Sequence, residues 1–136
     1  MADNEVKNDA ENIKKKIMII DDEQDFLEIT KLNLEGTGKY EVMPLSNTKD
    51  IIPKLRSFDP DVILLDILMP GKDGLQICEM LNSDPIGKEK PIIIISALIK
   101  NEDKLRAYKL GVIDYLTKPV EKNSLIFSID KAMRFK

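Results

Sequence analysis

The chain has 136 residues, a formal net charge of −3 and 43% hydrophobic residues, which is enough for the core of one domain but gives no basic surface for nucleic acid. It contains one cysteine, Cys78, and no histidine, so an intrachain disulfide, a histidine metal ligand and a phosphohistidine intermediate are excluded. No long apolar segment follows the polar start, so we predict neither a signal peptide nor a membrane span, and we expect a cytoplasmic protein.

The first residues form a polar segment without an apolar period. Charged and amide side chains alternate over residues 1–12, and the basic run Lys14-Lys15-Lys16 follows. We interpret residues 1–15 as a mobile leader and residues 16–136 as one domain. The lysine run is either a solvated flank of the first strand, which we favour, or a partner-binding patch.

Runs of consecutive aliphatic residues predict the central strands of a sheet. They occur at residues 17–20, 62–65 and 92–95. A strand covered on one side alternates apolar and polar residues, so unbroken runs indicate strands buried on both faces of a parallel sheet. The mixed segments 40–43 and 113–116 predict two edge strands.

Helical patterns separate these strands, and we place the helices at about 25–35, 47–57, 74–83, 101–110 and 121–134. A pairing of Asn47 with Asp50 is expected to open the second helix, whereas Gly36 and Gly111 are expected to close the first and the fourth. Strict alternation predicts an α/β fold: a flavodoxin-like, doubly wound sheet of five parallel strands in the order 2-1-3-4-5, with five helices.

Polar side chains follow four of the predicted strands: Asp21-Asp22-Glu23, Asp66, Ser96, and Thr117-Lys118-Pro119. In the predicted order the first and third strands are neighbours, which brings Asp21, Asp22 and Asp66 into one acidic pocket. Crowded carboxylates repel one another unless a cation lies among them, and Mg²⁺ prefers such oxygen ligands. With Lys118 and Ser96 they would form a cradle for a phosphoryl group, and one carboxylate would be free to act as the nucleophile.

These residues, in this order, resemble the receiver domains of response regulators in two-component signalling. The resemblance extends over roughly residues 16–134 and rests on Asp21-Asp22, the segment 66–74, Ser96-Ala97 and Lys118-Pro119. It implies that Asp66 accepts a phosphoryl group from a phosphohistidine or a small phosphodonor. It also implies that Mg²⁺ is bound directly by Asp22, Asp66 and the backbone carbonyl of Leu68, and through water by Asp21.

By the same resemblance, Ser96 would donate a hydrogen bond to the phosphoryl group, and Lys118 would pair first with Asp66 and then with the phosphate. The Lys118–Pro119 peptide bond is often cis in the family. Ser96 and Tyr115 would act as the switch, changing the surface formed by residues 101–110, 113–116 and 121–134. The protein would thus be a signalling module and not an enzyme beyond its own phosphorylation and slow dephosphorylation.

The partner implied is a sensor histidine kinase or a histidine phosphotransfer protein, because this chain has no histidine of its own. No direct nucleic-acid or membrane partner is expected, and the switch surface could also mediate a homodimer. The downstream target is not encoded in any recognisable motif. The chain would be either a stand-alone receiver or the N-terminal part of a longer regulator.

Simpler structural roles exist for several of these residues. Asp22 could cap the helix that begins near Asp25, and Ser96 could cap a strand end. The segment 69–71 could be only a turn, Gly74 could relieve crowding, and Lys118 could be a surface lysine. Tyr115 could be a static aromatic side chain, and Cys78 is expected to fill the core.

Two positions are aliphatic where some members of the family have polar residues. Leu68 and Leu98 lie two residues beyond Asp66 and Ser96, where the path of the hydrolytic water runs in the family, and neither side chain can orient that water. We therefore expect a long-lived acylphosphate. A phosphatase of the haloacid-dehalogenase type is a weaker alternative, because it needs an acid at the position of Leu68 and a cap for which the chain has no length. A receiver that only binds partners is another alternative.

The last predicted helix is amphipathic. An apolar stripe is expected to face the sheet and comprises Leu125, Ile126, Ile129, Ala132 and Met133. Phe127 lies on the opposite side of the helix, where it could be a partner or dimer contact or merely an isolated exposed apolar residue.

Overall fold

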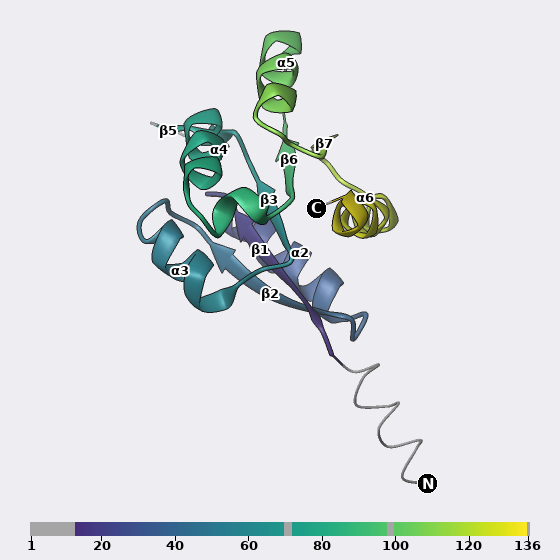
Figure 1. Ribbon diagram of the computed structural model, residues 1–136. Helices are drawn as coiled ribbons and strands as arrows, with labels where there is room; N and C mark the ends of the chain where they lie inside the picture. The colour runs from purple at the N-terminus through teal and green to yellow at the C-terminus, as the bar shows by residue number, and fades with distance from the viewer. Residues whose placement is uncertain (1–12, 70–71, 98–99, 136) are drawn as a thin grey trace, which may run out of the picture.

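The computed structural model describes residues 13–69, 72–97 and 100–135. One sheet of parallel strands forms the middle of the molecule (Figure 1), with the order β2-β1-β3-β6-β7. The strands are β1 (Lys15–Ile20), β2 (Tyr40–Leu45), β3 (Val62–Leu65), β6 (Ile92–Ser96) and β7 (Asp114–Thr117). Counted along the chain within this sheet, the order is 2-1-3-4-5, so the predicted topology is confirmed.

Burial distinguishes the central strands from the edges. Every residue of β3 and β6 is buried, as are residues 17–20 of β1. In β2 buried and more exposed positions mix, and the residues of β7 are only partly covered. The unbroken aliphatic runs therefore mark the strands covered on both faces, and the mixed segments mark the edges, as predicted.

Helices cover both faces of the sheet. They are α2 (Gln24–Glu35), α3 (Ile51–Phe58), α4 (Gly74–Ser83), α5 (Asn101–Lys109) and α6 (Lys122–Phe135), with a 3₁₀ turn, η1 (Gly87–Glu89). Figure 1 shows α3 and α4 on one side of the sheet and α6 on the other. Apolar side chains of α3, α4 and α5 pack into one core layer, and those of α2 and α6 into a second. No helix within the described ranges is long and apolar enough to cross a membrane.

The apolar stripe of α6 packs against the sheet as predicted. Leu125, Ile129 and Ala132 are buried in the core layer shared with α2, and Ile126 and Met133 are partly buried against it. Phe127 is exposed on the other side of the helix. The mobile leader predicted for residues 1–15 lies outside the described residues up to position 12, and β1 already begins at Lys15.

The helix ends differ in part from prediction. Gly111 closes α5 with a left-handed φ of +83°, as expected. Gly36 closes α2, which ends at Glu35, as predicted, but its φ of −61° is right-handed, and its N–H donates to the carbonyl of Leu32. Gly38, with φ +79°, takes the left-handed conformation instead, and its N–H donates to the carbonyl of Glu35. The left-handed residue thus lies two positions beyond the cap, because glycine permits a left-handed turn without requiring one.

The predicted start of the second helix is wrong. The side chain of Asn47 accepts a hydrogen bond from the N–H of Lys49 and so forms a local turn. The helix begins only at Ile51, after Asp50, which has a left-handed φ of 61° and whose side chain makes no capping hydrogen bond. The competing local turn explains why the helix starts four residues later than predicted.

A short hairpin after β3 was not predicted. It pairs β4 (Leu68–Met69) with β5 (Lys72–Asp73) in antiparallel fashion, and residues 70–71 lie outside the described residues. The hairpin leads into α4 at Gly74, where an added Cβ would lie 2.3 Å from the Cα of Ile67. Only glycine fits this approach, which agrees with the interpretation that Gly74 relieves crowding.

Candidate functional site

The predicted site residues lie together at the carboxyl ends of the strands. Asp21 directly follows β1, Asp66 follows β3, Ser96 is the last residue of β6, and Lys118 follows β7. In an open parallel sheet this edge is where ligands bind, near the point at which the strand order reverses. Here β1 and β3 are neighbours, which brings the first two of these residues close together.

Backbone hydrogen bonds continue the sheet pattern into the site. The N–H of Asp66 donates to the carbonyl of Ile20 at 3.0 Å, and the N–H of Lys118 donates to the carbonyl of Ser96 at 2.9 Å. Strand register therefore fixes the Cα positions of the site residues, and only their side chains need local contacts to orient them.

The three predicted carboxylates form one cluster. Asp21, Asp22 and Asp66 each offer an oxygen, and these oxygens all lie within 4.8 Å of one another. Asp21 and Asp66 are buried, with 1% and 3% of their surface exposed, whereas Asp22 lies nearer to solvent. Three oxygen donors at this separation fit a hard divalent cation.

Backbone N–H groups hold one oxygen of each buried carboxylate. The N–H of Glu23 donates to Oδ1 of Asp21 at 2.9 Å, and the N–H of Leu68 donates to Oδ1 of Asp66 at 2.8 Å. The Oδ2 atoms of both carboxylates face Lys118. Burial raises the pKa of Asp21, although the hydrogen bond from Lys118 acts in the opposite direction.

Asp22 does not cap α2, contrary to one of the simpler roles considered. The residue before the helix is Glu23, and its side chain makes no capping hydrogen bond either. Asp22 instead contributes to the carboxylate cluster, so its position fits a metal ligand better than a helix cap.

Lys118 is the positive centre of the site. Its Nζ lies 2.7 Å from Oδ2 of Asp21, 2.7 Å from Oε1 of Glu23 and 3.2 Å from Oδ2 of Asp66. The side chain is only 10% exposed, and Nζ lies 4.3 Å from the centre of the Phe26 ring. Burial acts to lower the pKa of Lys118, but hydrogen bonds to Asp21 and Glu23 outweigh it and raise the pKa. Lys118 is therefore a permanent cation and not a free surface lysine.

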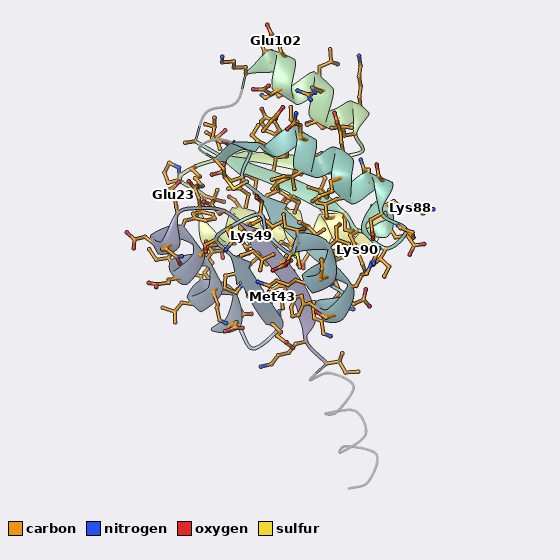
Figure 2. The ribbon with its side chains drawn as sticks, turned by 90° about the vertical axis from the view of Figure 1, so that its left-hand side faces the viewer. Glu23, Met43, Lys49, Lys88, Lys90 and Glu102 are labelled. Carbon is orange, nitrogen blue, oxygen red and sulfur yellow. The ribbon has the colours of Figure 1, made fainter. Side chains whose placement is uncertain are left out.

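The sequence reasoning missed Glu23 and Phe26 as parts of this site. Both come from the start of the first helical segment, and only the folded geometry shows that they contact Lys118. Figure 2 shows Glu23 and Lys88 on opposite sides of the view. The one available signal was that Glu23 continues the acidic run after β1. The cis geometry expected for the Lys118–Pro119 bond is confirmed.

Two buried hydroxyl groups distinguish the other half of the site. Ser96 is fully buried, and its Oγ has no hydrogen-bond partner in the described part of the chain, so it is not a strand-end cap. The hydroxyl of Tyr115 is also buried without a partner there, while its ring lies 5.0 Å from Nζ of Lys104. An unpaired buried hydroxyl is unfavourable, so each can gain a hydrogen bond from a ligand or a rearrangement.

Of the two aliphatic residues Leu68 and Leu98, the structure describes only the first. The side chain of Leu68 is half exposed beside the site, and its N–H donates to Asp66. Leu98 lies outside the described residues. Cys78 is buried in the core layer formed with α3 and α4, as expected.

Together these groups can bind a divalent cation and an anion side by side. The carboxylates provide oxygen ligands, Lys118 provides a fixed positive charge, and Ser96 provides a hydroxyl donor. A phosphoryl group on Asp66 would lie among all of them.

Comparison with known proteins identifies the family and agrees with the fold. The family model described as the response regulator receiver domain matches residues 17–130. The chemotaxis protein CheY4 of Vibrio cholerae is 22% identical, covers 88% of this chain and 99% of its own, and has a TM-score of 0.81. A CheY-like receiver domain protein of Methanospirillum hungatei is 24% identical, with 90% and 95% coverage and a TM-score of 0.81. The signal receiver domain of a modulated diguanylate cyclase from Desulfovibrio desulfuricans is 27% identical, with 90% and 95% coverage and a TM-score of 0.77.

Proposed function

This chain belongs to the response regulator receiver domain family, and from that premise we propose that Asp66 accepts a phosphoryl group from a phosphohistidine of another protein. One observation carries the proposal: the buried Asp66 carboxylate lies 3.2 Å from the Lys118 ammonium and within the same cluster as Asp21 and Asp22. The chain has no histidine, so a phosphohistidine donor lies outside it, and we propose a sensor histidine kinase or a histidine phosphotransfer protein as the partner.

The transfer is a displacement at phosphorus. A carboxylate oxygen of Asp66 attacks the phosphorus atom and forms an O–P bond, while the P–N bond of the donor breaks and its electron pair stays on the imidazole nitrogen. Lys118 keeps its proton throughout and balances charge on the phosphoryl oxygens. Ser96 donates its hydroxyl hydrogen to one of these oxygens, which satisfies a group that has no partner among the described residues at rest.

The carboxylate cluster fits Mg²⁺. We assign Asp22, Asp66 and the backbone carbonyl of Leu68 as direct ligands and Asp21 as a ligand through water. When bound, Mg²⁺ would supply charge neutralisation for the carboxylates and the phosphoryl oxygens. The chain's own contribution is to hold Asp21 and Asp66 in place through the N–H groups of Glu23 and Leu68.

The signal would leave the site through β6 and β7. Movement of Ser96 toward the phosphoryl group would open space for Tyr115, whose hydroxyl has no partner in the described residues at rest. This would shift the surface formed by α5, β7 and α6 from one conformation toward a second one. Phe127 is exposed on that surface and is a candidate contact for a target protein or a second copy of the chain.

The phosphorylated state is expected to be long-lived. Leu68 provides an apolar side chain beside Asp66 and cannot orient a hydrolytic water. We therefore propose that the protein catalyses its own phosphorylation but dephosphorylates slowly. Decay of the phosphoprotein within seconds, in pure protein with Mg²⁺, would contradict this.

Intact-protein mass spectrometry tests the proposal directly. The protein is incubated with acetyl phosphate and Mg²⁺, beside a metal-free sample, an Asp66→Asn variant and an Asp25→Asn control, which changes an exposed carboxylate on α2. We expect one added phosphoryl group in the wild type and in the control, and none in the other two samples. A folded wild-type protein that gains no mass would instead support a module that only binds partners.

A further inference from the structure

The shortest contacts of Lys118 are not with the proposed phosphoacceptor. Its Nζ lies 2.7 Å from both Asp21 and Glu23, but 3.2 Å from Asp66. An ammonium group has three protons to donate, and each carboxylate can take one. Phosphorylation of Asp66 replaces one of these contacts by a contact with the phosphoryl group attached to it. A second phosphoryl oxygen can gain a hydrogen bond from Lys118 only if the contact with Asp21 or Glu23 is given up.

Glu23 is the partner that is released most readily. Asp21 is buried, and its second oxygen is held by a backbone N–H, so an unpaired Asp21 would be costly. The side chain of Glu23 is 59% exposed, and a carboxylate at the surface returns to water with little loss of free energy. Glu23 also makes no side-chain hydrogen bond to α2, so its release does not uncap the helix.

We propose that Glu23 is a positioning residue: it holds the Lys118 ammonium in the resting state and is released when the phosphoryl group forms on Asp66. This inference rests on the proposed function. Glu23 acts through Lys118 and does not contact the phosphoryl group itself. Lys118 exchanges one anionic partner for another and stays fully hydrogen-bonded in both states.

Linkage fixes the direction of the effect. A contact that exists only in the resting state stabilises that state, so Glu23 opposes phosphorylation by the free energy of its ion pair. Its release would also change a groove of about 440 Å³ that Glu23, Phe26 and Lys118 line together with residues of α2 and α6. Phosphorylation would thereby alter the charge at the mouth of this groove as well as the surface of α5, β7 and α6.

Binding of beryllofluoride, an analogue of the phosphoryl group, tests this at saturating Mg²⁺. Glu23→Gln removes the charge, whereas Glu23→Asp keeps the charge but shortens the side chain by one methylene group. Asp25→Asn removes an exposed charge two residues along the chain and is the matched control. We expect both Glu23 variants to bind beryllofluoride about two- to fivefold more tightly than wild type, as befits loss of an exposed ion pair, and the control to be unchanged.

The contrast between the two Glu23 variants is decisive. If Glu23→Asp binds like the wild type while Glu23→Gln binds more tightly, the effect is only electrostatic repulsion of the anion, and the proposal is overturned. Equal tightening in Asp25→Asn, or no tightening in either Glu23 variant, would overturn it as well.

A second measurement does not depend on phosphorylation. Without metal or phosphodonor, the ε-methylene NMR signal of Lys118 should shift in both Glu23 variants and stay unchanged in Asp25→Asn. No shift in Glu23→Asp would mean that the resting contact does not exist. A different result is that the Lys118 signal shifts as expected in the Glu23 variants, but neither the wild type nor the variants bind beryllofluoride. The resting contact would then be supported, and both the release step and the proposed function would be overturned.

Discussion

The two halves of the site satisfy their polar groups very differently. In the charged half, Asp21 and Asp66 at the ends of β1 and β3 and Lys118 after β7 are buried or nearly so, and all three are paired. On the side of β6 and β7, the hydroxyl groups of Ser96 and Tyr115 are buried without a partner in the described residues. The charged half is thus complete at rest, whereas the hydroxyl half lacks two hydrogen bonds. We infer from this difference that the charged residues stabilise the resting state, whereas the two hydroxyl groups favour a change to another state.

Replacing Lys118 should have the largest effect, because it breaks the charged half. Lys118→Met leaves two buried carboxylates side by side without a cation. We expect phosphorylation by acetyl phosphate to slow on the order of 1000-fold and the free energy of unfolding to fall by about 3 kcal/mol without metal. Chemical denaturation checks the second effect. Unchanged stability would show that the ion pairs contribute little to the resting fold.

The same variant predicts a dependence on pH. Burial raises the pKa of Asp21 above its ordinary value of 3.8, and loss of Lys118 removes a hydrogen bond that lowers it. A carboxyl group with a raised pKa in the folded state stabilises the fold below its ordinary pKa and loses that contribution as the pH rises through the folded value. The deficit of Lys118→Met should therefore be largest near neutral pH and shrink toward pH 4, as denaturation across this range would show. A deficit that does not change with pH would contradict this.

Removing the serine hydroxyl should separate function from stability. Ser96→Ala deletes a group that makes no hydrogen bond to the described residues at rest, so the free energy of unfolding should stay the same or rise by about 1 kcal/mol. Phosphorylation should slow by about 100-fold, because a donor to the phosphoryl oxygens is lost. Ser96→Thr keeps the hydroxyl and should retain the rate. A clear loss of stability in the alanine variant would show that Ser96 has a partner at rest.

Mg²⁺ should stabilise the protein by binding to the carboxylate cluster, in which Asp22 lies nearest to solvent. At a Mg²⁺ concentration tenfold above its Kd, we expect the free energy of unfolding to rise by about 1.4 kcal/mol. Asp22→Asn should lose most of this gain, yet be as stable as the wild type without metal, since Asp22 lies nearer to solvent than Asp21 and Asp66. Denaturation with and without Mg²⁺ checks both statements. An undiminished gain in the variant would argue against Asp22 as a ligand.

The smallest expected effect is a difference in the free energy of unfolding between two tyrosine-to-phenylalanine variants. Tyr115→Phe removes a buried hydroxyl without a partner in the described residues and should raise the free energy of unfolding by up to about 1 kcal/mol. Tyr40→Phe removes a hydroxyl that donates to Asp130 at 3.2 Å and should lower it by about 1 kcal/mol. Burial and the nearby Asp130 raise the pKa of Tyr40 to about 12, so this hydroxyl keeps its proton. Thermal unfolding checks both variants, and equal changes in stability would contradict the predicted difference between the unpaired and the paired hydroxyl.

Much of the fold could be predicted because the strands carry their own signal. Residues 62–65 and 92–95 are aliphatic throughout and prove to be buried on both faces of the sheet. Once the order of the strands is known, the residue after each strand is placed as well, which is why Asp21 and Asp66 could be brought together from the sequence. Here position along the backbone determines position in space.

Features that depend on side-chain direction or local competition could not be predicted. Glu23 precedes a helix, and its spacing does not show that its carboxylate turns toward Lys118. The side chain of Asn47 forms a local turn instead of starting a helix. The two alternatives differ by small free energies that depend on a few neighbouring residues. The hairpin of β4 and β5 has two residues per strand, too few for an alternating pattern to show.

The burial of Cys78 makes the native chain a convenient background for spectroscopic labels. Its side chain is fully buried, and burial raises the pKa of the thiol to about 12, so almost no thiolate exists at neutral pH. Because it is the single cysteine of the chain, a maleimide or nitroxide reagent should react only with a new cysteine placed at the surface. Phe127→Cys would place such a probe on α6 without altering the core, so motion of that helix could be followed in otherwise unmodified protein.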